Sequence, residues 1–226
     1  MGVLLRTGTI EEVARRLTAQ YDDFAHHNKS NPLSELLFIL CSIRTGHLGY
    51  EESYRCLTRR FRTFNELACA SRVAISQTLV PSGLELQKAD YIVAIMDRLK
   101  ADFGRPTLSP LRHMPNEECE RFLVSLPGVG KKTARCVMLY SLGRAVFPVD
   151  THCWRIGRRL GWVRRTRLDG SCSPKDMDRF QRKIPTGLRF GLHVNMVSLG
   201  REICQSRRPR CGECPLGDLC PRIGVG

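Results

Sequence analysis

Four cysteines near the C-terminal end have the spacing of a metal centre. They follow the pattern Cys204-x6-Cys211-x2-Cys214-x5-Cys220. The short loop between Cys211 and Cys214 supplies two adjacent thiolates, and the longer arms can close around the same centre. A zinc ribbon usually has two short Cys-x2-Cys knuckles, whereas this segment has one. The spacing therefore favours an iron–sulfur cluster, with zinc and free thiols as the alternatives.

A short turn with two glycines lies between two predicted helices. Gly128 and Gly130 flank Val129, so the backbone can turn tightly and bring its N–H groups close to a phosphate at the start of the second helix. A lone Gly-x-Gly is often an ordinary tight turn. Between amphipathic helices of a basic chain it indicates a helix–hairpin–helix motif, and we expect these three residues and Lys131 to contact a nucleic acid backbone.

Two side chains close to this turn in the sequence could carry out chemistry. Lys132 lies in the first turn of the second helix, where the positive helix end and Lys131 disfavour the ammonium form and leave more free amine for nucleophilic attack. Asp150 stands at the predicted start of the next helix, where it could cap the helix and also act as a catalytic carboxylate. The alternatives are a solvated lysine and a simple N-cap.

The elements that must position these residues are helices. Hydrophobic periodicity is helical almost everywhere, and no convincing run of alternating residues indicates a strand. Thr9 and Glu12 form a capping-box pattern that predicts a helix through about Phe24. Pro32 opens a strongly apolar helix that runs to about Ile43. Further helices are predicted at residues 50–62, 86–103, 115–125, 131–142, 150–160, 174–183 and 189–203, which makes the fold class all-α.

The composition favours a globular, nucleic-acid-binding protein. The 226 residues are 42% hydrophobic, enough for one large domain or two lobes with their own cores. The net charge is +14, which points to a polyanionic partner. Residues 150–210 hold fifteen basic and five acidic residues, so phosphate contacts are expected to concentrate there. Arg207, Arg208 and Arg210 lie inside the first loop of the cysteine cluster, where they could grip phosphates.

The lack of long apolar stretches indicates where in the cell the protein is expected, and this in turn guides the interpretation of the remaining cysteines. No segment is long and apolar enough for a signal peptide or a membrane span, so we expect a cytoplasmic, nucleoid-associated protein. In that reducing compartment the eleven cysteines do not indicate a disulfide framework. The isolated ones are interpreted as small core residues: Cys41, Cys56, Cys69, Cys119, Cys136, Cys153 and Cys172.

Together these stretches resemble the endonuclease III family of helix–hairpin–helix DNA glycosylases, over nearly the whole chain from Asn31 to Cys220. The resemblance implies a six-helix barrel lobe formed by residues 29–142. It implies a second lobe formed by residues 1–28 and 143–226, which carries a [4Fe–4S] cluster. By motif match, Lys132 is the nucleophilic lysine and Asp150 the essential aspartate. The implied cluster ligands are Cys204, Cys211, Cys214 and Cys220.

The family resemblance also implies a reaction. A monomer would bind damaged double-stranded DNA, flip the damaged nucleotide out and remove its base, most simply an oxidised pyrimidine. Lys132 would form a Schiff base with the sugar, and β-elimination would cut the strand on the 3′ side of the abasic site. Leu84 matches the position at which the family inserts an apolar wedge into the base stack.

One segment departs from the family pattern. Relatives usually carry Ser-Ala-Gln-x-Thr-Asp where this chain has residues 42–47, Ser-Ile-Arg-Thr-Gly-His, so Arg44 replaces the glutamine that fills the vacated stack. Arginine prefers the O6 and N7 edge of guanine, which suggests a preference for lesions opposite guanine. His47 replaces a normally anionic residue and could titrate or face solvent.

Four alternative interpretations remain open. Adenine-removing mismatch glycosylases carry a catalytic glutamate where this chain has Ile39, lack the hairpin lysine and have a further C-terminal domain. A monofunctional mismatch or lesion-specific glycosylase would share the fold without the lyase step, and a non-catalytic DNA-binding module would share only the hairpin and the basic lobe. A zinc-dependent nuclease would need a second cluster of metal ligands, which the sequence does not show.

Overall fold

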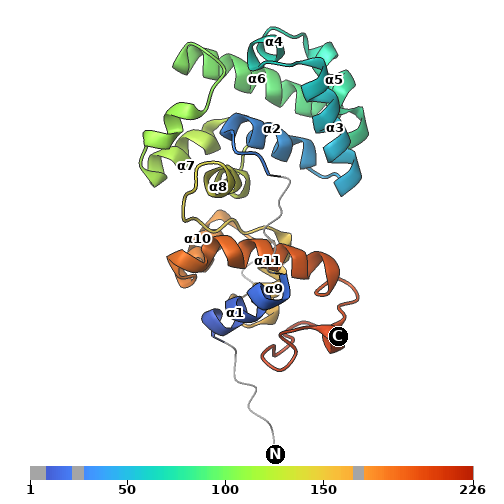
Figure 1. Ribbon diagram of the computed structural model, residues 1–226, viewed down its shortest axis with the longest axis vertical. Coiled ribbons are helices and arrows are strands. Elements are labelled where there is room, and N and C mark those ends of the chain that lie inside the picture. The colour runs from blue at the N-terminus through green and yellow to red at the C-terminus, as the bar shows by residue number, and fades with distance from the viewer. Residues whose placement is uncertain (1–8, 22–27, 165–170, 226) are drawn as a thin grey trace, which may run out of the picture. The chain divides into compact units, whose positions relative to one another are not determined.

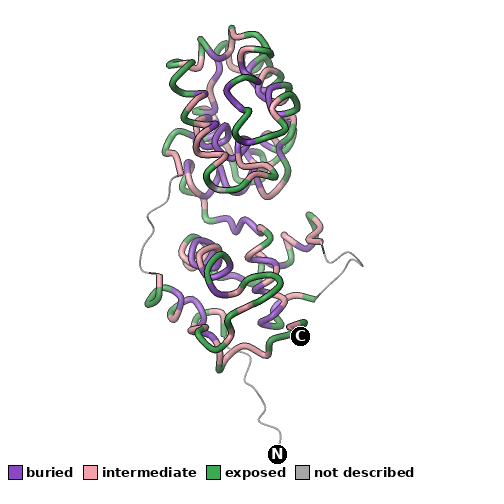
Figure 2. Tube along the Cα trace, turned by 90° about the vertical axis from the view of Figure 1, so that its right-hand side faces the viewer, coloured by how far each residue is buried: buried purple, intermediate pink, exposed green. Residues whose placement is uncertain are grey.

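The chain divides into two units with separate cores. The computed structural model describes residues 9–21, 28–164 and 171–225. One unit comprises residues 27–144, and the other comprises residues 1–26 together with 145–226. Buried residues gather inside each unit (Figure 2). The described residues contain α-helices and 3-10 turns but no strand, so the prediction of an all-α fold is confirmed.

The unit of residues 27–144 is organised around one apolar helix, α2 (Pro32–Ser42). Asn31 begins it by accepting hydrogen bonds from the N–H groups of Leu33 and Ser34 at 3.0 and 3.1 Å. Nearly all of α2 is buried, and it packs against α3, α6 and α8 (Figure 1). The helices of this unit after α2 are α3 (His47–Arg60), α4 (Phe64–Ala68), α5 (Arg72–Leu79), η1 (Val80–Ser82), α6 (Glu85–Phe103), η2 (Ser109–His113), α7 (Asn116–Ser125) and α8 (Lys131–Tyr140).

The other unit has a core rich in aromatic side chains. Phe147 and Phe180 meet edge to face with ring centroids 5.3 Å apart, and Trp162 lies against Phe180 at 6.3 Å. α1 packs against α11, and α11 packs against α9. The helices of this unit are α1 (Ile10–Tyr21), α9 (Thr151–Arg159), α10 (Pro174–Lys183), η3 (Thr186–Leu188), α11 (Arg189–Glu202) and η4 (Cys211–Glu213). None of the described helices of either unit is long and apolar enough to cross a membrane.

Local capping signals predicted the helix starts well. The N–H of Glu12 donates to the hydroxyl of Thr9 at 3.2 Å, as the capping-box pattern predicts. The predicted end of this helix, at Phe24, lies outside the described residues. α4 and α5 were not predicted because they are only 5 and 8 residues long, too short for a helical periodicity to show. Their caps, Thr63 and Ser71, accept hydrogen bonds from backbone N–H groups.

The isolated cysteines are mostly, but not all, core residues. Cys41, Cys119, Cys136 and Cys153 are buried, as predicted, whereas Cys56 and Cys172 are half-buried. The prediction was wrong for Cys69, which is exposed. The reason is that Cys69 directly follows the short helix α4, at its C-cap, where the chain has already left the core.

The two hairpin glycines provide a matched test of the turn. Gly128 has a φ of +74°, and a Cβ there would lie 2.5 Å from the ring of Tyr91. Gly130 has a φ of −88° and open space around its Cα. We predict that Gly128→Ala lowers the free energy of unfolding by about 2–4 kcal/mol, from backbone strain and overpacking.

Gly130→Ala is the control and should cost less than about 1 kcal/mol, because only the N-cap preference is lost. Urea unfolding of both variants measures the difference. Equal losses would show that neither the φ of Gly128 nor its contact with Tyr91 limits the turn.

Candidate functional site

The turn between α7 and α8 has the geometry of a helix–hairpin–helix. Gly128 adopts the left-handed conformation, and the N–H of Val129 donates to the carbonyl of Leu126 at 3.1 Å. α8 then begins as the N–H of Ala134 bonds to the carbonyl of Gly130 at 2.9 Å. Both glycines are exposed, so a phosphate can approach their backbone at the N-terminal end of α8.

Val129 plays a different part from the one predicted for it. Its side chain is only 5% exposed, and its N–H is already bonded within the turn. Val129 therefore anchors the hairpin in the core, and the flanking glycines carry the surface that a DNA backbone can reach.

Lys131 is held by an ion pair. Its ammonium lies 3.2 Å from a carboxylate oxygen of Glu120, and the buried guanidinium of Arg135 approaches the other oxygen at 2.7 Å. Glu120 thus offsets part of the positive charge at the start of α8. The influence that the sequence assigned to Lys131 on its neighbour Lys132 is correspondingly smaller.

Lys132 is half-buried in the first turn of α8, and a buried carboxylate lies near it. The carboxylate belongs to Glu35 on α2, which is 0% exposed. It accepts hydrogen bonds from the Nδ2 of Asn28 at 2.5 Å and from the N–H of Lys29 at 2.7 Å. Glu35 was not predicted from the sequence to belong to the site. The available signal was a lone carboxylate inside the most apolar helix of the chain, where an unpaired charge is costly.

The electrostatics of Glu35 connect it to Lys132. Burial raises the pKa of the Glu35 carboxyl, while its two hydrogen bonds and the nearby charges of Lys29 and Lys132 act in the opposite direction.

Arg44 and Leu84 lie on two loops of the same unit and share an unusual backbone. Their φ angles are +51° and +54°, a conformation that costs non-glycine residues energy and tends to persist at functional sites. Both are exposed, and Leu84 is 42% exposed. Other large apolar side chains are exposed nearby in the sequence: Leu48, Val80 and Leu86. This composition suits an apolar wedge for a base stack.

In the other unit, Asp150 caps α9. Its Oδ1 accepts a hydrogen bond from the N–H of Cys153 at 2.7 Å, which confirms the N-cap interpretation. The side chain is half-buried, so part of the carboxylate remains exposed to solvent. A helix N-terminus favours the anionic form of such a carboxylate.

The C-terminal half of α9 is hydrogen-bonded to the cysteine loop. Arg159 is buried, and its guanidinium donates to the sulfur of Cys204 at 3.1 Å and to the carbonyls of Gln205 and Ser206 at 2.8 and 3.0 Å. Arg155 donates to the carbonyl of Cys204 at 2.9 Å. The helix that Asp150 begins therefore also fixes the first cysteine of the cluster segment.

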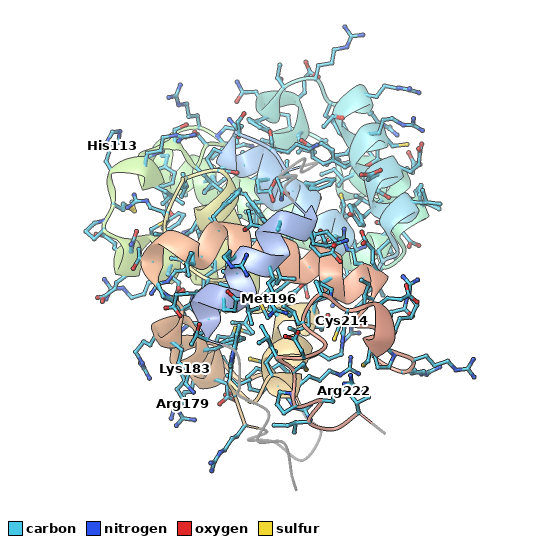
Figure 3. The ribbon with its side chains drawn as sticks, turned by 60° about the horizontal axis from the view of Figure 1, so that its bottom comes forward. His113, Arg179, Lys183, Met196, Cys214 and Arg222 are labelled. Carbon is cyan, nitrogen blue, oxygen red and sulfur yellow. The ribbon has the colours of Figure 1, made fainter. Side chains whose placement is uncertain are left out.

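The four cysteines line one hollow, together with apolar and basic residues. They come from the end of α11, from η4 and from the loop that follows, in which Figure 3 labels Cys214 and Arg222. Within the described part of the chain, no three such side chains lie close enough together for a single metal ion. A [4Fe–4S] cluster instead takes one thiolate at each of its four irons, so the wider spacing around a shared hollow fits the cluster.

The surroundings of two of these cysteines disfavour free thiolates. Burial raises the pKa of Cys214 and Cys220, and the neighbouring cysteine thiolates raise it further. Iron would remove this repulsion by binding the thiolates directly.

The basic residues of the cysteine loop divide into two groups. Arg207 and Arg208 are exposed, as phosphate contacts require. Arg210 instead bonds to Glu213 at 2.9 Å and to the carbonyl of Glu202 at 2.9 Å. Arg210 is exposed as well, but Glu213 offsets part of its charge, so we expect Arg210 to contribute less to phosphate binding.

Comparison with known proteins shows to which family the chain belongs. Residues 204–220 match a family model described as the iron-sulfur binding domain of endonuclease III. An Endonuclease III of Thermotoga maritima is 32% identical over 212 residues, which span 93% of this chain and 92% of the relative. The chain belongs to the endonuclease III family. It is thus a DNA glycosylase with the helix–hairpin–helix fold and a [4Fe–4S] cofactor, which decides against zinc.

Two further likenesses span most of the chain. A structure of a trapped covalent intermediate between endonuclease III and DNA, an estranged-adenine complex, superposes with a TM-score of 0.79 at 25% identity and covers 94% of both chains. A Thymine-DNA glycosylase of Aeropyrum pernix is 27% identical over 225 residues, which cover 96% of this chain and 97% of the relative. Relatives that match nearly the whole chain therefore include proteins named for different activities.

The contact between Arg159 and the cysteine loop predicts how firmly the cluster is held. Purified protein should absorb broadly near ~400 nm and contain about four irons per chain. Arg159→Met should lose this absorbance several-fold faster in the presence of an iron chelator, because the loop loses donors to one sulfur and to its carbonyls. Arg158→Met, which removes a charge one residue earlier, is the control. Equal rates would show that Arg159 does not hold the loop.

The division of the loop arginines predicts the salt dependence of DNA binding. Arg207→Ala and Arg208→Ala should each lower the slope of log K against log salt by about one unit, because each removes one phosphate contact. Arg210→Ala should change the slope less, because Glu213 already offsets its charge. Filter binding to undamaged duplex at several salt concentrations measures the slopes. An unchanged slope in the first two variants would place the DNA surface elsewhere.

Proposed function

We propose that this enzyme removes a damaged base and then cuts the DNA strand at the resulting abasic site. The observation that carries the proposal is the position of Lys132, half-buried in the first turn of α8 directly after an exposed Gly-x-Gly hairpin. A hairpin that binds the phosphate backbone would bring this amine close to the sugar. The covalent intermediate with DNA that was trapped in the similar endonuclease III structure supports a reaction through a covalent enzyme–DNA intermediate.

In the first step, the flipped nucleotide meets Lys132. Its Nζ attacks C1′ of the sugar, the bond from C1′ to the base breaks, and the base leaves with its electron pair and takes up a proton. The bond from C1′ to O4′ then breaks, one proton passes from the nitrogen to O4′ to form a 4′-hydroxyl, and the product is a positively charged iminium at C1′. The carboxylate of Glu35 near Lys132 would stabilise this positive charge.

In the second step, the iminium acidifies the hydrogen on C2′. Removal of this proton sends its electron pair toward the iminium, and the bond from C3′ to its phosphate oxygen breaks. The strand is cut on the 3′ side of the former abasic site. Water then releases the sugar fragment and regenerates the amine of Lys132.

Asp150 is the proposed partner in base removal. Its carboxylate would stabilise the positive charge that develops on the sugar as the base leaves, and it would assist proton transfer. The hydrogen bond from the N–H of Cys153 orients the carboxylate for this task. Cys204, Cys211, Cys214 and Cys220 are the proposed cluster ligands, because all four line the same hollow.

The proposed substrate is chromosomal duplex DNA with an oxidised pyrimidine, bound by a monomer. Gly128, Gly130, Lys131, Arg207 and Arg208 would hold the phosphate backbone. Leu84 would enter the base stack and Arg44 would read the opposite strand, with a preference for guanine.

A monofunctional thymine-mismatch glycosylase is the second candidate. The likeness to the Thymine-DNA glycosylase of Aeropyrum pernix, which spans nearly both chains, favours it. Such an enzyme would remove the base without a covalent intermediate. A panel of duplexes with oxidised pyrimidines, thymine mismatches, uracil and abasic sites, each with varied opposite bases, separates the two specificities.

Borohydride trapping tests the lyase mechanism. Reduction during reaction with abasic DNA should freeze the Schiff base as a covalent complex. We predict that Lys132→Ala abolishes trapping but retains most of the DNA affinity, whereas Lys131→Ala, the matched control, still traps. Asp150→Asn should cap α9 as well but lower base removal by on the order of 10²-fold or more.

The outcomes separate the candidates. Trapping that survives Lys132→Ala would move the nucleophile to another amine. Base removal without any trapping by the wild-type enzyme would favour the monofunctional candidate.

A further inference from the structure

A lysine outside the proposed chemistry is buried with all of its hydrogen bonds made. Lys88 on α6 is 1% exposed. Its Nζ donates to the carbonyl of Cys41 at 2.8 Å, to the hydroxyl of Thr45 at 2.9 Å and to the carbonyl of Ser82 at 2.9 Å. An ammonium has three N–H donors and no acceptor, so these three oxygens complete its coordination.

The three acceptors lie in two segments that are distant in the sequence, the end of α2 with the loop that follows it and the end of η1 just before the Leu84 loop. Cys41 and Thr45 lie on either side of Arg44, and Ser82 lies two residues before Leu84. The loops are also bonded to each other, because the hydroxyl of Thr45 contacts the carbonyl of Ser82. The backbone N–H of Lys88 donates to the carbonyl of Leu84 at 2.9 Å. The second loop is therefore held by both the backbone and the side chain of Lys88.

The same two loops carry backbone strain. In the described ranges, the non-glycine residues with positive φ are Arg44, Leu84 and Arg222, and the first two stand on the loops that Lys88 joins. A left-handed conformation at such residues persists only where the surroundings enforce it. The hydrogen bonds from Lys88 restrain the backbone of both segments in this way.

We propose that Lys88 is a positioning residue that locks the Arg44 loop and the Leu84 loop into one rigid wedge for insertion into the DNA base stack. The proposal rests on the proposed function, in which these two side chains enter the duplex beside the flipped nucleotide. Leu84 supplies the apolar edge of the wedge and Arg44 its polar contact to the opposite strand. A wedge whose two parts move independently would unstack the bases less often and lose the flipped nucleotide.

The choice of lysine at this position follows from the geometry. Three acceptors surround one point, which suits the compact ammonium, whereas the planar fork of arginine cannot reach all three from one atom. A methionine has a similar length and no donor, so in Lys88→Met the carbonyl of Cys41 would lose the Lys88 donor and the carbonyl of Ser82 would keep only the hydroxyl of Thr45.

Fluorescence of 2-aminopurine tests the wedge. We would place it beside a tetrahydrofuran abasic-site analogue in duplex DNA and add cluster-loaded enzyme. Wild-type enzyme should raise the fluorescence, because insertion unstacks the probe. Lys88→Met should lose most of this rise and slow single-turnover base removal on the order of 10- to 100-fold, while affinity for undamaged duplex changes less than about 2-fold, because no phosphate contact is removed.

Two other variants complete the experiment. Lys100→Met is the matched control, since Lys100 lies on the same helix and donates to the carbonyl of Ala68 at 2.6 Å, away from both loops; it should keep the fluorescence rise. Thr45→Val removes one acceptor and the bond between the loops, so it should lose part of the rise. This variant carries the test if Lys88→Met does not fold.

The results distinguish this proposal from the proposed function. A rise in wild type that Lys88→Met and Thr45→Val both retain would overturn the positioning role and leave the proposed function standing. No rise in wild type would overturn wedge insertion and the positioning role with it. A rise lost equally in Lys100→Met would show a general loss of stability instead of positioning, and would also overturn the proposal.

Discussion

The structure depends on one constraint, that a buried backbone carbonyl must have a hydrogen-bond donor. At the ends of helices the intrahelical donors run out, and long basic side chains supply them here. Lys88 holds carbonyls of two loops, Arg144 holds three carbonyls at the end of η2, and Arg159 holds three in the cysteine loop. The segments proposed to act on DNA or to carry the cluster are thus held by buried cations as well as by apolar packing.

Because some basic side chains bind backbone carbonyls, the net charge overstates the number of side chains that can contact DNA. The excess of basic residues in 150–210 suggested a lobe covered with phosphate contacts. Several of them serve the fold instead: Arg189 donates to three carbonyls, including that of Ala145 at 2.6 Å, and Lys183 donates to the carbonyl of Trp162 at 2.6 Å. The surface available for DNA is therefore smaller than the charge count indicates, and Arg207 and Arg208 remain its clearest members.

Features encoded by short spacing could be predicted from the sequence, and those that depend on distant contacts could not. The hairpin, the N-cap at Asp150 and the cysteine spacing each lie within a few residues, so their geometry follows from local rules. Glu35 and Lys88 looked like ordinary helix residues, because Glu35 comes near Lys132 only through the packing of α2 with α8, and Lys88 reaches Cys41 only through the packing of α2 with α6. The buried side chain of Val129 and the exposure of Cys69 likewise depend on tertiary packing.

The central claim is that Lys132 becomes covalently attached to the sugar during the reaction. The most direct measurement is tandem mass spectrometry of the borohydride-reduced complex after nuclease and protease digestion. The account predicts a reduced deoxyribose fragment on the peptide that contains Lys132, on the side-chain amine of that residue. A fragment on Lys131, on the N-terminal amine or on any other lysine would contradict it.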